Sequence, residues 1–269
     1  MQIFPNHILV ANPTIKKYPT DVAYIALRST VANALVKAGL IPVVVGPEMD
    51  QEAALWLYEQ CAGVVFTGGA DWNPTTYHQA RAKETQPSDD ARDSLEQLLL
   101  AQALTDKKPI LGICRGMQGL AIALYKMHAI SSKESILIQE ISHLTSQTHY
   151  APYEAMHLNK REVTITPRTI AHEIFRRAAV LMPKGHHQAV DKDVVAKVPH
   201  VIISGLSTKD GLVEMIELNR SVHPFCFATQ GHPEVDGKLY LPLFLRLGRE
   251  AEKFAKNYNR PLSPPHQLA

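Results

Sequence analysis

The sequence predicts an α/β fold in which a doubly wound, mostly parallel open sheet carries antiparallel strands at its edge. Short apolar runs alternate with amphipathic helical segments in the first half, which is typical of a parallel sheet covered on both faces. The second half holds further apolar runs with few helical segments between them, which indicates antiparallel additions. This loss of alternation favours an open sheet over a closed barrel.

Strand and helix signals follow one another regularly in the first half. The apolar runs expected to form parallel strands are 7–11, 41–45, 63–66 and 109–113. The segments expected to form helices are 24–38, 50–61, 89–105 and 117–126. Asp50 is a suitable helix N-cap and Gly39 a suitable C-terminal stop. The order predicts a flavodoxin-like three-layer α/β/α arrangement.

The second half is less regular. Its expected strands are 162–165, 201–206, 212–218 and 224–228, and its final helix is 239–258. Two polar stretches, 73–87 and 131–156, are expected to be long loops of the kind that form lids or binding loops. We expect one domain over residues 1–259, followed by an exposed tail at 260–269 that holds three prolines.

Composition excludes several classes of protein. A net charge of +2 over 269 residues gives no strong field toward nucleic acid or an anionic membrane. No signal peptide or membrane-spanning run is recognisable, so a cytoplasmic location is expected. The odd cysteine count without a C-x-x-C pair argues against a disulfide framework or a structural zinc site. Cys61 and Cys226 lie in apolar runs and are interpreted as buried structural thiols.

Cys114 lies where an apolar strand passes into a helix, between Gly112 and Gly116. This pattern is that of a nucleophile elbow, a strained turn whose flanking glycines allow close approach of neighbouring backbone. The helix expected from Arg115 directs its positive dipole end at the sulfur, which favours the reactive thiolate. The alternative is a buried structural cysteine, but the glycines and the strand–helix junction favour a nucleophile.

A general base for this thiol is predicted just beyond the run 224–228. His232 is followed two residues later by Glu234, and a carboxylate there can fix the imidazole tautomer. A surface histidine in a turn is the alternative. The combination of this His-Pro-Glu with an elbow cysteine is more specific than either alone.

Acyl transfer also needs N–H donors for the developing oxyanion. The backbone amide of Arg115, next to the nucleophile, is one candidate. Gly69, in the glycine turn after the third strand, offers a second, although a plain tight turn is the alternative.

Four landmarks in this order resemble the peptidase C26 branch of the class I glutamine amidotransferase-like superfamily, and within it the γ-glutamyl-γ-aminobutyrate hydrolases. They are 68–71 with Pro74 and Tyr77, the nucleophile segment 112–118, the segment 207–217, and the Gln-x-His-Pro-Glu segment 230–234.

The resemblance implies a stand-alone cysteine hydrolase that releases glutamate from small γ-glutamyl amides through a thioester. Cys114 would attack the γ-carbonyl, His232 would protonate the departing amine, and Glu234 would orient His232. The amides of Gly69 and Arg115 would hold the oxyanion. The residues that the resemblance implies for substrate binding are Gly68, Gln118, His186, His187 and Gln188, although a plain polar loop is the alternative for the last three. It implies no metal and no organic cofactor, and we expect a small-molecule substrate, no nucleic acid or membrane partner, and a possible homodimer.

The chain departs from the family pattern in informative places. Arg115 is more typical of stand-alone hydrolases than of amidotransferase subunits, which commonly have an apolar residue there. Gly231 replaces the usual Trp, which predicts a looser or wider site. The segments 126–140 and 183–188 also differ from the family, so the amine half of the substrate stays open.

Three alternatives remain at this point. One is a glutaminase subunit that supplies ammonia to a synthetase, and another is a degenerate binding protein of the same fold. The third is a zinc site built from His186, His187 and other histidines, which is disfavoured because adjacent histidines usually point apart.

Overall fold

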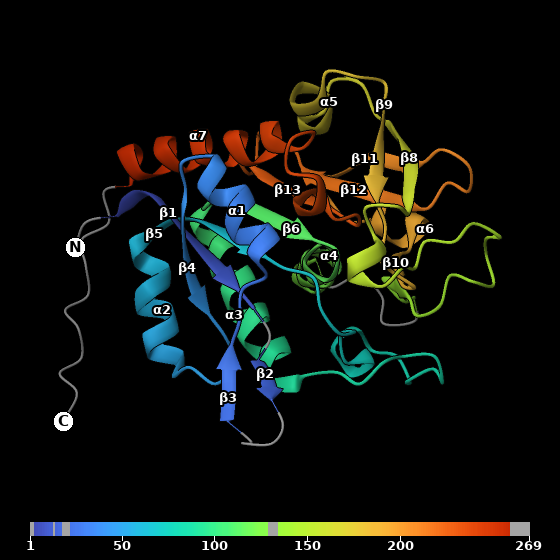
Figure 1. Cartoon of the computed structure of the whole chain (residues 1–269), viewed down its shortest axis with the longest axis horizontal. Coiled ribbons are helices and arrows are strands. Elements are labelled where there is room, and N and C mark those ends of the chain that lie inside the picture. The colour runs from blue at the N-terminus through green and yellow to red at the C-terminus, as the bar shows by residue number, and fades with distance from the viewer. Residues whose placement is uncertain (1–2, 13, 18–21, 129–133, 259–269) are drawn as a thin grey trace.

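The computed structural model describes residues 3–12, 14–17, 22–128 and 134–258. Among these residues, nine strands form one mixed sheet (Figure 1). In sheet order they are β4 (Ile41–Val45), β1 (Phe4–Ala11), β5 (Cys61–Phe66), β6 (Ile110–Ile113), β13 (Cys226–Thr229), β12 (Val213–Leu218), β11 (Val201–Ser207), β8 (Lys160–Ile165) and β9 (Ala179–Pro183). Pairing is parallel from β4 to β13 and antiparallel from β13 to β9. The predicted antiparallel edge is therefore confirmed.

Helices cover both faces of the sheet. One face packs against α1 (Ser29–Lys37), α5 (Ile170–Phe175) and α7 (Leu241–Asn257). The other packs against α2 (Gln51–Gln60), α3 (Asp90–Asp106), α4 (Arg115–Met127) and the short α6 (Lys192–Val195). This gives the predicted three-layer α/β/α arrangement, with an apolar core on each side of the sheet.

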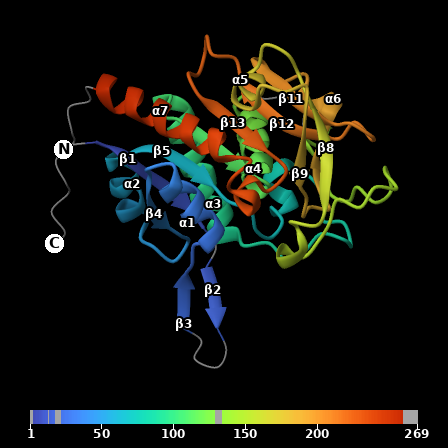
Figure 2. The same cartoon turned by 45° about the horizontal axis from the view of Figure 1, so that its top comes forward.

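Two small strand pairs lie outside the main sheet. The antiparallel ribbon of β2 (Thr14–Lys17) and β3 (Val22–Ile25) projects from the body in both views (Figures 1 and 2). The second pair, β7 (Leu137–Ile138) and β10 (Ala189–Val190), is also antiparallel. It ties the predicted loop 131–156 to the segment after 183.

Most of the predicted elements are confirmed with small shifts at their ends. Asp50 is the N-cap of α2 and accepts from the amides of Glu52 and Ala53. The prediction of a helix over 24–38 is wrong at its start, because residues 22–25 pair as β3 and α1 begins only at Ser29. The structure adds elements that the sequence analysis did not predict, namely β2, β3, β7, β9, β10, α5 and α6.

The predicted tail at 260–269 lies outside the described residues. Within the described part of the chain, none of the helices combines the length and apolar character that crossing a membrane requires.

The carboxyl ends of three neighbouring strands, β5, β6 and β13, lie at one edge of the sheet. Phe66 of β5 is in register with Gly112 of β6, and Thr229 of β13 is in register with Ile113. The loops that begin at residues 67, 114 and 230 therefore leave the sheet side by side. This is the edge at which open α/β sheets bind ligands.

Candidate active site

Cys114 occupies a strained turn between β6 and α4. Its backbone has φ 53° and ψ −106°, a conformation that non-glycine residues rarely adopt. A Cβ on Gly116 would lie 2.2 Å from the carbonyl oxygen of Phe66, and one on Gly112 would lie 2.8 Å from that of Gly116. Both flanking glycines are therefore required by close backbone contacts, as the elbow pattern predicts.

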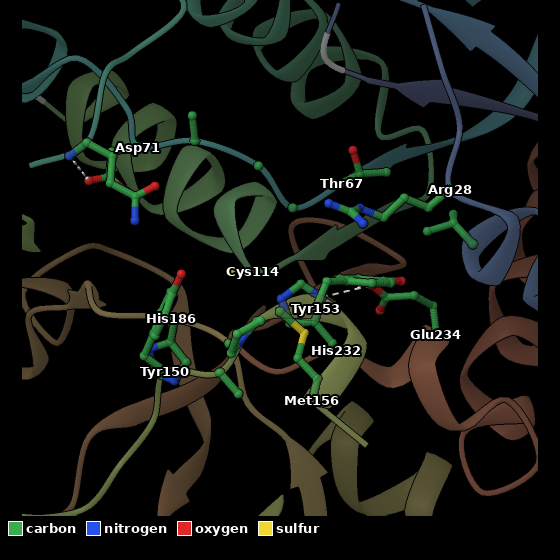
Figure 3. A pocket seen from close by; sticks show the side chains of 18 of the residues that line it. Arg28, Thr67, Asp71, Cys114, Tyr150, Tyr153, Met156, His186, His232 and Glu234 are labelled. Carbon is green, nitrogen blue, oxygen red and sulfur yellow. Dashed lines mark hydrogen bonds and ion pairs between the residues drawn. The ribbon is translucent and has the colours of Figure 1, made fainter. Parts of the chain in front are cut away.

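His232 and Glu234 form a buried pair beside this turn. The imidazole Nδ1 lies 2.8 Å from Oε1 of Glu234, a contact drawn as the dashed line beside Glu234 in Figure 3. A Cβ on Gly68 would lie 2.9 Å from Cε1 of His232 and 3.6 Å from Cβ of Cys114. The backbone of Gly68 thus lies against both Cys114 and His232. Residues that follow the ends of β5, β6 and β13 therefore meet at this point.

The electrostatics of the pair favour a charged imidazole. Burial lowers the pKa of His232, but the negative charges of Glu234 and Cys114 outweigh it and raise that pKa to about 10. At neutral pH the imidazolium form therefore predominates.

Tyr153 covers the imidazole from the pocket side. Its ring stands edge-on to that of His232, with centroids 5.9 Å apart, and its hydroxyl donates to Glu234 Oε1 at 3.5 Å. The same hydroxyl contacts the Thr30 hydroxyl, and the Arg28 guanidinium lies 3.9 Å from the ring centroid. Burial and the nearby Glu234 raise the pKa of Tyr153 to about 12, so the phenol stays protonated.

A cavity of about 530 Å³ opens over these groups (Figure 3). All but one of the predicted site residues line it, namely Gly68, Gly69, Cys114, Gln118, His186, His187, Gln188, His232 and Glu234. Residues 150–153 and Met156 form another part of its wall, and they belong to the stretch predicted to be a binding loop.

The exception is Arg115, whose side chain points away from the cavity. Its guanidinium is buried in contact with Asp93 and Glu96 and lies 4.0 Å from the ring centroid of Trp72. Trp72 Nε1 donates to the Arg115 carbonyl at 3.0 Å. The Arg115 backbone N–H is the first of helix α4, so it has no intrahelical acceptor. The side chain thus anchors the turn, while the amide remains a candidate oxyanion donor.

Arg92 secures the glycine turn after β5. Its Nη2 donates to the carbonyl oxygens of Thr67 and Gly68 at 3.1 and 3.2 Å, and its Nε to Glu96 at 2.6 Å. A Cβ on Gly69 would lie 2.0 Å from Arg92 Nη1, so a side chain there would displace the Arg92 guanidinium from these contacts. Burial and the adjacent Arg115 lower the pKa of Arg92 to about 10.

Two glutamines link the elbow helix to the His232 loop. Gln118 Nε2 donates to Gln230 Oε1 at 3.3 Å, and Gln230 Nε2 lies 3.6 Å from the Cys114 sulfur. An amide N–H near the sulfur stabilises negative charge on it. Gln230 was recognised only as part of a motif, and the structure adds this contact.

Gly231 does not widen the site. A Cβ at this position would lie 2.0 Å from Cγ of Met182 and 2.8 Å from the Pro183 carbonyl oxygen. The His232 amide donates to that same carbonyl at 2.9 Å. The expectation of a looser site is wrong because β9 occupies the space that a larger side chain would fill.

The adjacent histidines point in different directions, as expected. His187 bridges two carboxylates, with Nε2 3.1 Å from Asp71 Oδ1 and Nδ1 3.2 Å from Glu140 Oε2. The hydrogen bond to Asp71 outweighs the effect of burial and raises the pKa of His187. His186 turns the other way, toward Glu214 behind the cavity wall.

Sequence reasoning missed the residues near the start of α1 that contact Tyr153. Arg28 and Thr30 fell inside a predicted helix, where no motif marked them. Tyr153 lay in a predicted binding loop, but nothing in that loop singled it out. Cys61 and Cys226 are buried as interpreted, and burial raises the pKa of both thiols, that of Cys61 to about 12.

Comparison with known proteins agrees with this geometry. The peptidase C26 family model matches residues 11–234. The glutamine amidotransferase-like protein RP404 of Rickettsia prowazekii is 29% identical over 260 residues, which cover 84% of this chain and 89% of that protein. Protein NtpR of Enterococcus hirae is 31% identical over 208 residues, which cover 76% and 79% of the two chains.

Solved structures show the same fold at low identity. The glutaminase domain of Trypanosoma brucei CTPS with bound acivicin superimposes with a TM-score of 0.62 at 16% identity, covering 92% of this chain and 94% of that one. A glutamine amidotransferase from Thermotoga maritima gives a TM-score of 0.51 at 14% identity, covering 94% of each chain. Together with the family match, which spans most of the sequence, these results show that the chain belongs to the peptidase C26 family of glutamine amidotransferase-like hydrolases.

Proposed function

We propose that this protein is a stand-alone hydrolase that cleaves the γ-glutamyl amides of small amines or amino acids. One observation carries the proposal: the thiol of Cys114, on a strained strand–helix turn, and the imidazole of His232, held by Glu234, meet against the bare backbone of Gly68. A nucleophile, a base and an orienting carboxylate within one cavity are the parts that acyl transfer requires.

The first half of the reaction forms a thioester. The Cys114 thiolate attacks the γ-carbonyl carbon, and the amides of Gly69 and Arg115 hold the resulting oxyanion. The tetrahedral intermediate collapses with cleavage of the C–N bond, and the His232 imidazolium gives its proton to the departing amine. The products of this half are the free amine and a γ-glutamyl thioester on Cys114.

The second half hydrolyses the thioester. His232, now neutral, takes a proton from water while the hydroxide portion attacks the thioester carbonyl. Collapse breaks the C–S bond, releases glutamate and restores the thiolate–imidazolium pair. The raised pKa of His232 supports this cycle, because the imidazole recovers its proton readily at neutral pH.

Substrate contacts are proposed for the remaining polar groups of the cavity. Gly68, Gln118, His186, His187 and Gln188 line it. We assign His187, between Asp71 and Glu140, to the recognition of the zwitterionic end of the glutamyl group.

A second candidate is a glutaminase that supplies ammonia to a synthetase. It is favoured by a CTP synthase of Pyrobaculum calidifontis, which is 32% identical over 161 residues that make up 29% of that protein. The buried Arg115 favours the stand-alone hydrolase, because the resemblance associates that residue with hydrolases. A glutaminase would prefer glutamine, whereas the proposed hydrolase prefers larger γ-glutamyl amides.

The test is a glutamate-release assay with γ-glutamyl-γ-aminobutyrate, glutathione and glutamine. We expect release from at least one of the first two substrates, with a higher kcat/KM than for glutamine and none for Cys114→Ala. Preference for glutamine, increased by an added synthetase, would favour the second candidate. Absence of release from all three substrates by the reduced protein would overturn the proposal.

A labelling experiment separates an active enzyme from a degenerate binding protein. Iodoacetamide should alkylate Cys114 faster than Cys61 and Cys226, which are sealed in apolar packing. Equal slow labelling of all three cysteines would show that position 114 carries no activated thiol.

A further inference from the structure

A second group of ionisable side chains lies behind the wall of the cavity. His149, His186 and Glu214 are all buried, and each offers one ligand atom within 4.8 Å of the other two. Oε1 of Glu214 lies 3.6 Å from Nδ1 of His149 and 3.8 Å from Nε2 of His186. These three residues, which we call the His149 cluster, are separate from the Cys114–His232 pair.

Hydrogen bonds on the far sides of both rings fix how the cluster is oriented. His149 Nε2 donates to Asp210 Oδ2 at 2.7 Å, and His186 Nδ1 donates to the Gln188 carbonyl oxygen at 2.9 Å. Each ring therefore turns its other nitrogen toward Glu214. A histidine that donates to a carboxylate or a carbonyl while its second nitrogen faces inward is the usual arrangement of a metal ligand.

The inward-facing atoms lack hydrogen-bond partners within the described part of the chain. This holds for Nδ1 of His149, Nε2 of His186 and the carboxylate of Glu214, apart from an ion pair between Glu214 and Lys184. Buried acceptors that face one another repel and cost stability unless a cation lies between them. The single ammonium of Lys184 contacts Oε2 of Glu214 and gives neither imidazole nitrogen a hydrogen bond.

We propose that the His149 cluster binds a divalent transition-metal ion of the zinc class, through Nδ1 of His149, Nε2 of His186 and the carboxylate of Glu214. Two imidazoles and a carboxylate form a ligand set that zinc accepts. Tetrahedral ligands with bonds of about 2.1 Å lie about 3.4 Å apart, close to the two separations seen here. Small side-chain movements would close the site around the ion.

The ion would join three parts of the chain that meet behind the wall of the cavity. His149 belongs to the loop before Tyr153, His186 to the segment after β9, and Glu214 to β12. A metal here would hold the loop of Tyr153 against the sheet and would stabilise the folded protein. None of these ligands carries a step of the proposed hydrolysis, although His186 is also among the residues proposed to contact the substrate.

Lys184 competes with the metal for Glu214. Its ammonium is a positive charge at the carboxylate that the ion requires, and like charges at that distance repel. Lys184→Met removes this competitor while keeping a long apolar side chain in the buried space. We therefore expect Lys184→Met to bind the metal more tightly than the natural chain.

The test is direct titration of the tag-free, chelator-treated protein with Zn²⁺ in competition with a chromophoric chelator, together with elemental analysis. We expect one ion per chain and a rise in the midpoint of thermal unfolding. Glu214→Gln and His149→Asn should lose binding, and Asp210→Asn should weaken it by roughly 10- to 100-fold. His187→Asn and His143→Asn, which leave the cluster intact, should bind like the natural chain.

Circular dichroism of each variant separates loss of binding from loss of fold. If Glu214→Gln does not fold, the Zn²⁺ affinities of Asp210→Asn and Lys184→Met test the proposal instead, because neither substitution removes a ligand. Binding that His143→Asn abolishes, or that folded His149→Asn retains, would overturn the proposal as adventitious surface binding. Binding by Lys184→Met alone would also overturn it, since the natural chain would then keep its ammonium in place of the metal.

Discussion

At the scale of single residues, the two glycines that flank Cys114 allow close backbone contacts that hold the turn. Gly116 meets the backbone of β5 and Gly112 meets the backbone of α4, so each allows a contact that any side chain would block. The strained φ of Cys114 is held by these contacts and by its amide, which donates to Thr229 at 2.8 Å. The turn is thus fixed from both sides.

Gly116→Ala should destabilise the protein by at least about 1–3 kcal/mol, because its Cβ would overlap the Phe66 carbonyl oxygen and force β5 and α4 apart. The measurement is the free energy of unfolding in urea. Gly237→Ala is the matched control, since a Cβ there meets nothing within 4 Å and φ is −61°. That variant should gain about 0.4–1 kcal/mol. Equal stability of the two variants would contradict the packing described here.

The charge of Glu234 determines the pH above which His232 can no longer act as the general acid. Glu234 raises the pKa of His232, so Glu234→Gln should lower that pKa, and the imidazolium should lose its proton at a lower pH. We expect the basic limb of the kcat/KM profile near pH 10 in the natural chain, and Glu234→Gln should move it toward neutrality. Asp236→Asn, which removes only a half-exposed contact with Lys160, should leave the limb in place. An unmoved limb in Glu234→Gln would refute this assignment.

At the scale of elements, helices α3 and α4 are joined by a buried ionic cluster. Arg92 and Arg115 share the carboxylate of Glu96, whose side chain is fully buried, and Asp93 completes the charge balance. Through Arg92 the cluster holds the glycine turn, and through Arg115 it holds the elbow. Two loops of the candidate site therefore depend on one helix that contributes no side chain to the cavity.

Glu96→Gln should cost roughly 3–5 kcal/mol of unfolding free energy, because it leaves two buried guanidinium groups without a full countercharge. Urea unfolding measures this loss. Glu252→Gln removes a carboxylate with the same i,i+4 spacing from an exposed pair with Lys256, and it should leave the urea midpoint unchanged. A Glu96→Gln variant as stable as Glu252→Gln would show that the cluster does not support the turn.

At the scale of the whole molecule, sequence analysis predicted the elements that have a clear pattern of apolar residues. It missed short strands that form only by pairing with segments elsewhere in the chain. The parallel strands and helices α2, α3 and α4 are marked by apolar runs and caps, so local reasoning found them. Strands β7 and β10 have two residues each and exist because they pair with one another, which no local pattern encodes. The helix predicted from residue 24 failed for the same reason, since β3 is defined by its partner β2.

The residues of the candidate site also fall into two groups, those that a local motif marks and those that only the fold brings together. Cys114, His232 and Glu234 follow strand ends and belong to motifs, so spacing and residue type identified them before the fold was known. Tyr153 and Arg28 could not be found in this way, because their positions over the imidazole depend on how two loops meet in space. The buried partners of His186 were equally hidden, since His149 and Glu214 are far apart in sequence.

The position of β13 in the sheet has a consequence for synthesis of the protein. This strand lies between β6 and β12 although every other strand of the main sheet precedes it in the sequence. Until it arrives, the nascent polypeptide carries an unpaired edge on β6, and the amide of Cys114 lacks the Thr229 acceptor that secures the turn. Translation thus delivers the thiol well before its imidazole, and the edge of β6 stays open on the nascent polypeptide in the interval.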